Sequence, residues 1–67
     1  MESNLGRIRK GRGLSQQKLS ELSGINLRLL QDYEQGHKNI NGAAVVRIVA
    51  LAKVLDCNVE DLLEPGE

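Results

Sequence analysis

Several residue types that stabilise or equip small proteins are nearly absent from this 67-residue chain. It holds one cysteine and one histidine, which excludes a disulfide framework and a four-ligand structural zinc site. Its only aromatic residue is Tyr33, whereas proteins that bind single-stranded nucleic acid rely on stacked aromatic side chains. A chain of this size buries only about 60% of its unfolded surface. We therefore expect one domain, residues 1–67, stabilised by helix packing.

Long hydrophobic runs are also absent. The longest apolar run is far too short to span a bilayer, and no apolar segment follows the charges at the N-terminus. We expect a soluble, cytoplasmic protein without a membrane partner. The chain has no low-complexity stretch or solenoid repeat, and it ends in a short acidic tail, residues 64–67.

The formal net charge is zero, although DNA-binding proteins normally gain most of their non-specific affinity from basic surface. The charges are unevenly distributed. Residues 1–18 hold five basic residues and one acidic residue, while residues 56–67 hold five acidic residues and no basic one. An N-terminal end that faces phosphate and a C-terminal end that faces away would fit this distribution, but ordinary solvated faces fit equally well.

Helix starts are indicated by a recurring pattern: an apolar residue, a capping residue, and a second apolar residue five positions after the first. The pattern occurs four times, as Leu14-Ser15 with Leu19, Ile25-Asn26 with Leu30, Ile40-Asn41 with Val45, and Cys57-Asn58 with Leu62. An earlier helix, with Leu5, Ile8 and Arg9 on its inner face, ends at Gly11 or Gly13. The sequence therefore predicts an all-α fold of five short helices, near residues 3–11, 16–23, 27–35, 42–55 and 59–63.

The second and third of these helices form the outline of a helix-turn-helix motif, at about residues 16–35. Gly24 supplies the positive φ that a tight turn between helices often requires. Helical periodicity turns one set of apolar side chains inward, and we expect them in the core. They are Leu19, Leu22, Ile25, Leu30 and Tyr33.

The opposite side of the third helix carries polar groups: Arg28, Gln31, Asp32 and Gln35. Arginine can bond bidentately to guanine, glutamine to adenine, and a carboxylate can accept from cytosine. This face therefore suits the major groove of DNA, although a solvated helix back would have the same composition.

Residues 5–63 resemble the helix-turn-helix domain of the phage Cro and repressor family, also called the xenobiotic-response-element family. The matching residues are Arg-Gly-Leu-Ser-Gln at 12–16, Leu19, Ser23-Gly24-Ile25, Leu30, Tyr33-Glu34-Gln35-Gly36, Leu51-Ala52-Lys53-Val54-Leu55 and Val59-Glu60-Asp61-Leu62-Leu63. The resemblance implies that the helix beginning at Leu27 is the recognition helix. It also implies that the preceding helix lies across the DNA backbone with its N-terminus toward phosphate.

By position, the resemblance implies that Gln16 contacts phosphate and braces the recognition helix. It places Leu27, Arg28 and Asp32 at base edges. It places Gln35 and Lys38 at phosphates, and it makes Arg9 and Glu34 a structural ion pair. The residues expected to contact DNA are Gln16, Gln17, Asn26, Leu27, Arg28, Gln31, Asp32, Gln35, Lys38 and Asn39.

Two of these residues depart from the family pattern. Leu27 is apolar where a hydrogen-bonding group is frequent, and it can contact a thymine methyl, anchor another protein or pack at the rim. Asp32 brings negative charge toward phosphates, but it lies four residues after Arg28. Such a pair is worth about 0.2 to 0.5 kcal/mol in an isolated helix. We expect Arg28 to provide the main discrimination between bases.

The loop from Gly36 to Asn41 is longer than the commonest form of the family, so Lys38 and Asn39 can reach backbone phosphates. His37 lacks neighbours at metal-ligand spacing and is expected to be solvated. We expect Cys57 to serve as a small hydrophobe, since no sequence feature brings His37 beside it. The chain is therefore expected to be no enzyme and to have no metal or cofactor.

The helix predicted at 42–55 contains more apolar surface than one inner face requires. Val45, Ile48, Ala52 and Leu55 can serve the core. A second stripe, with two residues of the last helix, either packs within the fold or forms a two-fold dimer contact. It consists of Val46, Ala50, Val54, Val59 and Leu63.

The preferred interpretation is a double-stranded DNA-binding transcriptional regulator that reads the major groove and represses by occluding its operator. We expect a homodimer at least on DNA, and no small-molecule effector is evident. The alternative is a protein-interaction module that uses Leu27 and Leu29 as anchors and binds DNA weakly or not at all.

Overall fold

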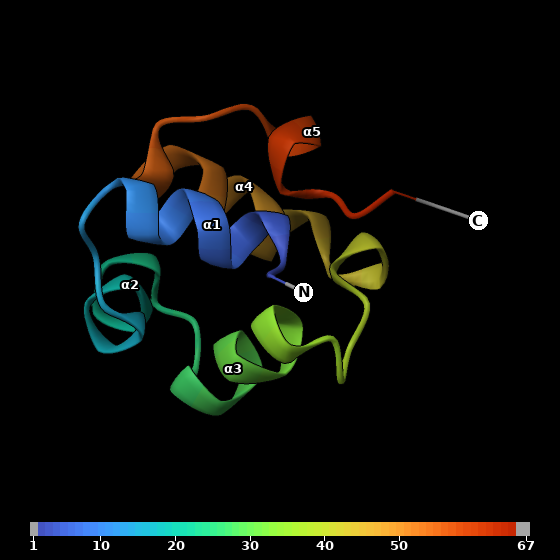
Figure 1. The fold of residues 1–67 in the computed structure, drawn as a ribbon, viewed down its shortest axis with the longest axis horizontal. Helices are drawn as coiled ribbons and strands as arrows, with labels where there is room; N and C mark the ends of the chain where they lie inside the picture. Colours follow the sequence, from blue (N-terminus) through green and yellow to red (C-terminus); the bar gives the residue numbers. More distant parts are fainter. Residues whose placement is uncertain (1, 66–67) are drawn as a thin grey trace.

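Five α-helices and one short 3₁₀ helix form the fold in the computed structural model, which describes residues 2–65 (Figure 1). No strand occurs in that range, so the all-α prediction is confirmed. Gly66 and Glu67, the end of the predicted acidic tail, lie outside the described residues. The elements are α1 (Asn4–Gly11), α2 (Gln16–Ser23), α3 (Leu27–Gln35), η1 (Ile40–Gly42), α4 (Val45–Leu55) and α5 (Val59–Leu62).

Three of the four predicted capping residues begin their helices. Ser15 Oγ accepts the backbone N–H of Lys18 at 3.0 Å, and Asn26 Oδ1 accepts the first N–H groups of α3. Asn58 precedes α5, and its own N–H donates to the carboxylate of Asp61 at 3.0 Å. These starts were predictable because a cap and its partner lie within one helical turn of each other.

The predicted helix start at residue 42, with Asn41 as its cap, is wrong. Residues Ile40–Gly42 form η1, capped by Asn39, and α4 begins only at Val45, after Ala44. Asn41 is engaged elsewhere: its side chain accepts the backbone N–H of Glu64 and donates to the carbonyl of the same residue, both at 2.9 Å. Val45, expected in the core, is 74% exposed. A contact across 23 residues thus overrides the local capping signal.

A single core joins all these elements. Helix α4 packs against α2 and α5, while α1 packs against α3 and α5. The core consists of Leu5, Leu19, Ile25, Leu30, Tyr33, Ile40, Ile48, Leu51, Ala52, Leu55 and Leu62. Its longest helix, α4, has 11 residues, and none of the helices in residues 2–65 has the length and apolarity needed to span a membrane.

Leu22 is another correction, because it is 52% exposed rather than buried. The inner face of α2 is centred on Leu19, with the small side chains of Ser20 and Ser23 beside it. Both hydroxyls donate hydrogen bonds on that side, Ser20 to the carbonyl of Ile25 and Ser23 to that of Leu19. Because polar side chains with local partners occupy the inner face, Leu22 is turned toward solvent.

Candidate nucleic-acid interface

The turn between α2 and α3 is held by short hydrogen bonds. Gly24 has φ +75°, and an added Cβ would meet no atom within 4 Å, so glycine is required by the backbone conformation and not by space. Ser20 Oγ donates to the Ile25 carbonyl at 2.5 Å, and Ser23 Oγ accepts the Ile25 N–H at 3.3 Å. These contacts determine how the chain enters α3, which lies along one edge of the molecule (Figure 1).

A buried ion pair connects α1 to α3. Arg9 donates to both carboxylate oxygens of Glu34, at 2.7 and 2.9 Å, and to the carbonyl of Leu14 at 2.7 Å. The two side chains are only 9% and 8% exposed. The hydrogen bonds to Glu34 raise the pKa of Arg9 above its usual value, so this guanidinium is permanently charged. The pair expected from the resemblance therefore lies inside the fold, where it orients α3.

Gln16 extends this pair to α2. Its Nε2 donates to Glu34 Oε1 at 3.0 Å, and its Oε1 lies 3.5 Å from Gln31 Nε2. The first residue of α2 is thus attached to two residues of α3, which fits the bracing role implied for Gln16. These two contacts join the start of α2 to the middle and the last turn of α3.

The outer face of α3 presents the expected base-reading residues unequally. Arg28 is 81% exposed, and its Nε lies 3.4 Å from Asp32 Oδ1. Gln35 is also exposed, whereas Leu27, Gln31 and Asp32 are half-buried. Arg28 is therefore the one basic residue of α3, and its side chain is exposed on the outer face of the helix.

Asp32 is less of an obstacle to a polyanion than its charge suggests. Its side chain is 16% exposed and lies between two cationic or cation-forming groups, Arg28 and His37 Nδ1, the second at 3.6 Å. Its backbone carbonyl accepts the N–H groups of His37 and Lys38 at 2.9 and 3.2 Å. The carboxylate is thus directed along the protein surface, and the following loop is attached to the last turn of α3.

Of the residues expected at phosphates, Gln35, Lys38 and Asn39 are exposed and Gln16 is half-buried. Gln17, at the start of α2, donates to the Glu21 carboxylate at 3.3 Å. Lys38 and Asn39 lie in the loop after α3, and Asn39 Oδ1 accepts the N–H of Asn41. Among residues 2–65 Lys38 has no carboxylate partner, so its charge is available to an external anion.

The N-terminal basic residues do not face a phosphate backbone as a group, contrary to one of the two charge interpretations. Arg9 is buried, Lys10 pairs with Glu2 at 2.7 Å, and Arg12 donates to the carbonyls of Leu55 and Asp56 at the end of α4. Because α1 packs against α5, the basic and acidic ends of the sequence lie side by side. Arg9 is thus used inside the fold, and Lys10 and Arg12 have partners at its surface, whereas Arg7 and Lys18 are exposed.

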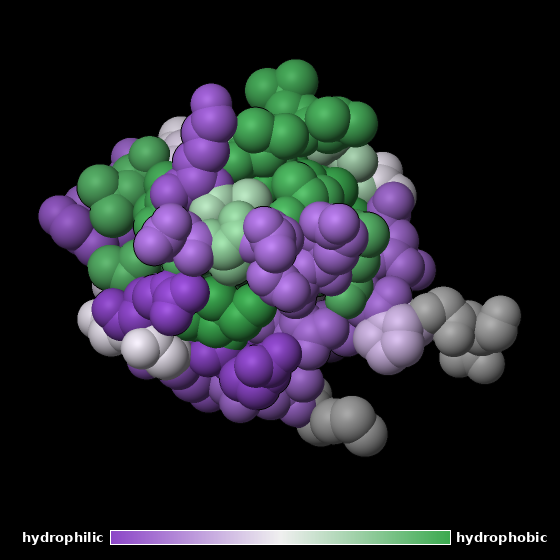
Figure 2. All heavy atoms as spheres, turned by 90° about the horizontal axis from the view of Figure 1, so that it is seen from above, coloured by the Kyte–Doolittle hydropathy of each residue, from purple (hydrophilic) through white to green (hydrophobic). Residues whose placement is uncertain are grey.

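The five residues considered for dimerisation do not form one exposed stripe. Val54, Val59 and Leu63 are partly buried against the core. Val46 is 78% exposed, and it shares a surface with Ala50 and with two residues that the sequence analysis did not place there, Val45 and Val49. We call these four residues the outer face of α4. Figure 2 shows apolar side chains gathered along the edge of the molecule where this helix lies.

Cys57 is a poor candidate for a nucleophile. It is half-buried, and burial raises the pKa of its thiol, which disfavours the reactive thiolate. No group of three or more His, Cys, Asp or Glu side chains within the described part of the chain is arranged to hold a metal ion.

Comparison with known proteins places this geometry in a family. The helix-turn-helix family matches residues 5–62, which confirms the resemblance seen in the sequence. Two uncharacterised HTH-type transcriptional regulators, from Rickettsia conorii and Rickettsia prowazekii, are each 39% identical over 57 residues. That alignment covers 85% of this chain but only 43% and 42% of the relatives, so the chain spans less than half of their length.

A similar solved structure is the restriction-modification controller protein C.AhdI from Aeromonas hydrophila. It is 33% identical, with a TM-score of 0.78 over 90% of this chain and 86% of that protein. The five helices and the turn at Gly24 are thus parts of a known architecture. The chain belongs to the helix-turn-helix family.

Proposed function

We propose that this chain is a sequence-specific double-stranded DNA-binding transcriptional regulator that represses by occupying its operator. The observation that carries the proposal is the outer face of α3, where Arg28 is 81% exposed. The loop that follows this helix adds Lys38, which is exposed and has no carboxylate partner among residues 2–65. The family and fold are those of DNA-binding regulators rather than enzymes, and the two relatives are described as transcriptional regulators. A cytoplasmic location is part of the same proposal.

In the proposed complex, α3 enters the major groove and α2 crosses the backbone. Arg28 donates to a guanine, with Asp32 restricting the orientation of its guanidinium. Gln17, Gln35 and Lys38 contact phosphates at the borders of the groove. Gln16 remains bonded to Glu34 and transmits the position of α2 to α3.

Binding to duplexes selected from a random pool tests the proposal. Affinity should fall steeply with rising salt, because each neutralised phosphate releases counterions. Arg28→Ala should weaken binding to the selected duplex more than to a scrambled one. Arg7→Ala, which removes an exposed arginine on α1, is the matched control and should leave the ratio unchanged. Equal losses on both duplexes for Arg28→Ala would make Arg28 a phosphate contact, and an absence of binding at low salt would refute the proposal.

We also propose that two copies bind together through the outer face of α4. Four neighbouring small or branched apolar residues line this surface. Val45 and Val46 are exposed, while Val49 and Ala50 are half-buried. A partner is also favoured because one recognition helix reads few base pairs. A two-fold pair would place the recognition helices one DNA turn apart, about 34 to 36 Å.

The oligomeric state of Val46→Glu tests the dimer. Sedimentation on a palindromic duplex should give two cooperatively bound copies for the unmodified chain and non-cooperative binding for the variant. Glu60→Gln, an exposed change on α5, serves as control. Non-cooperative binding by the unmodified chain on a palindrome would refute the dimer while leaving DNA binding intact.

A further inference from the structure

Tyr33 is a core residue whose polar end has no internal function. The residue is 5% exposed and belongs to the hydrophobic core, together with Leu30 and Ile40. Its hydroxyl forms no hydrogen bond within residues 2–65, yet no fully buried side-chain nitrogen or oxygen in that range lacks a partner. The hydroxyl oxygen must therefore reach the surface.

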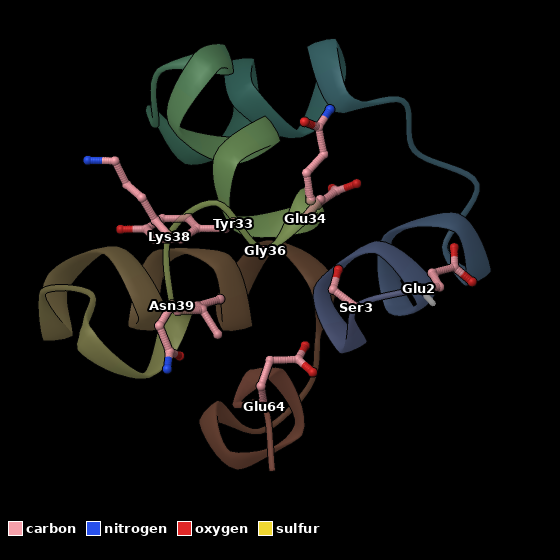
Figure 3. A pocket seen from close by; sticks show the side chains of 10 residues that line it. Glu2, Ser3, Tyr33, Glu34, Gly36, Lys38, Asn39 and Glu64 are labelled. Atoms are coloured by element: carbon pink, nitrogen blue, oxygen red, sulfur yellow. The ribbon is translucent and has the colours of Figure 1, made fainter. Parts of the chain in front are cut away.

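Tyr33 lines a pocket of about 280 Å³ between the loop after α3 and the N-terminal end of α1. Its hydroxyl lies at the outer edge of this pocket, on the side of Lys38, and points away from Glu2, Ser3 and Glu64 (Figure 3). Figure 3 shows Tyr33, Lys38 and Asn39 on one side of this pocket and Glu2, Ser3 and Glu64 on the other. We call the first three residues the donor side. A buried tyrosine whose hydroxyl is unpaired at the protein surface indicates a position where a ligand can bind.

The carboxylates of the pocket already have partners, whereas the donor side does not. Glu34 is bonded to Arg9 and Gln16, and Glu64 accepts the backbone N–H of Asn4 at 2.7 Å. Glu2 pairs with Lys10. Within the described residues, the Tyr33 hydroxyl, the Lys38 ammonium and the Asn39 amide nitrogen lack partners, and donors of this kind favour an anion.

The donor side is also correctly placed for a DNA strand. Its loop follows α3 directly and is attached to the last turn of that helix, because the carbonyls of Asp32 and Tyr33 accept loop N–H groups. A strand bordering the groove that α3 enters would pass the end of this helix.

We propose that the Tyr33 hydroxyl donates a hydrogen bond to a phosphate of the DNA backbone, beside the Lys38 ammonium; this rests on the proposed function. The ring holds the hydroxyl in the core, so its donor is positioned before DNA arrives and little side-chain freedom is lost on binding. Tyr33 is thus a phosphate-positioning residue rather than a reader of bases.

Tyr33→Phe removes only the hydroxyl, which has no partner in the described part of the protein. The variant should keep the urea midpoint of the unmodified chain and lose about tenfold in affinity, a value typical of a hydrogen bond to a charged acceptor. The loss should be equal on the selected and the scrambled duplex. The salt dependence should not change, whereas Lys38→Gln should lower its slope by about one and the control Arg7→Gln, at an exposed position of α1, should not.

Two further measurements identify the phosphate. A methylphosphonate placed at the contacted position should weaken binding of the unmodified chain but not of Tyr33→Phe. Because the chain has one tyrosine, a ¹³Cζ label gives a single resonance. It should shift on addition of the selected duplex and remain in place with inorganic phosphate alone, which separates the DNA backbone from a small phosphate ligand.

The outcomes distinguish this inference from the function on which it rests. If the unmodified chain binds DNA with strong salt dependence and Tyr33→Phe binds equally well, the inference is wrong and the proposed function stands. If no duplex binds at low salt, both fail. Should Tyr33→Phe lose its fold, the ¹³Cζ resonance of the unmodified chain decides alone, and an unshifted resonance on DNA overturns the contact.

Discussion

The Arg9–Glu34 pair is expected to contribute a large part of the stability of this small domain. In Glu34→Gln one acceptor oxygen remains at residue 34. The buried guanidinium of Arg9 loses its counterion and one of its two hydrogen bonds to that residue, which measure 2.7 and 2.9 Å. Removing one partner of a buried pair costs about 3 to 5 kcal/mol. With one oxygen retained, we expect a loss of about 3 kcal/mol.

That loss is large for a chain of this size. At roughly 0.05 to 0.15 kcal/mol per residue, the whole domain is stable by only about 3 to 10 kcal/mol. The melting temperature should therefore fall by at least about 12 °C, since 1 kcal/mol corresponds to about 4 to 8 °C in a domain of 60 to 100 residues. Urea unfolding followed by circular dichroism measures the change.

Two other variants make the experiment decisive. Lys10→Gln breaks the exposed pair with Glu2, whose side chains are 64% and 42% exposed, and should leave the urea midpoint unchanged. Arg9→Met combined with Glu34→Leu removes both charges and should recover most of the stability lost in Glu34→Gln. If Glu34→Gln is no less stable than Lys10→Gln, or if the double change is worse than Glu34→Gln alone, the reasoning about an orphaned buried charge is wrong.

Three further predictions concern stability and are measured by the same urea unfolding. Gly24→Ala should lower the free energy of unfolding by about 1 kcal/mol, because φ is +75° there. Gly11→Ala, at an open helical position, should not lower it. Equal effects of the two changes would contradict the requirement for glycine in the turn. Arg12→Met should lose about 1 to 2 kcal/mol, since its guanidinium satisfies two carbonyls at the end of α4; an unchanged midpoint would mean that water replaces it fully. Leu22→Lys should change stability by less than about 0.5 kcal/mol because the side chain is 52% exposed, and a loss above about 2 kcal/mol would restore Leu22 to the core.

Local signals in the sequence predicted most helix starts. Ser15, Asn26 and Asn58 each bond, or are bonded by, groups within the first turn of the helix that follows. The positive φ of Gly24 was predictable for the same reason, since a turn between two short helices has few backbone solutions. These predictions needed no knowledge of where other helices lie.

Residues that bond to a distant part of the chain were not predictable in this way. Asn41 has the composition of a cap, but its amide bonds to the backbone of Glu64, 23 residues later. Arg12 counted as basic surface in the sequence, yet its guanidinium donates to the carbonyls of Leu55 and Asp56 at the end of α4. Periodicity also offered two faces of α4, and only the packing of α2 and α5 decided which one is exposed.

The interface combines both kinds of information. The sequence by itself determined an all-α chain with a helix-turn-helix motif and Arg28 on the outer side of its second helix, because helical period and capping act over three or four residues. Only the tertiary structure decided that Lys10 and Arg12 have partners within the protein and that the hydroxyl of Tyr33 remains free on the side of Lys38. Those outcomes depend on which groups distant in the sequence pack together, and local sequence patterns do not specify such contacts.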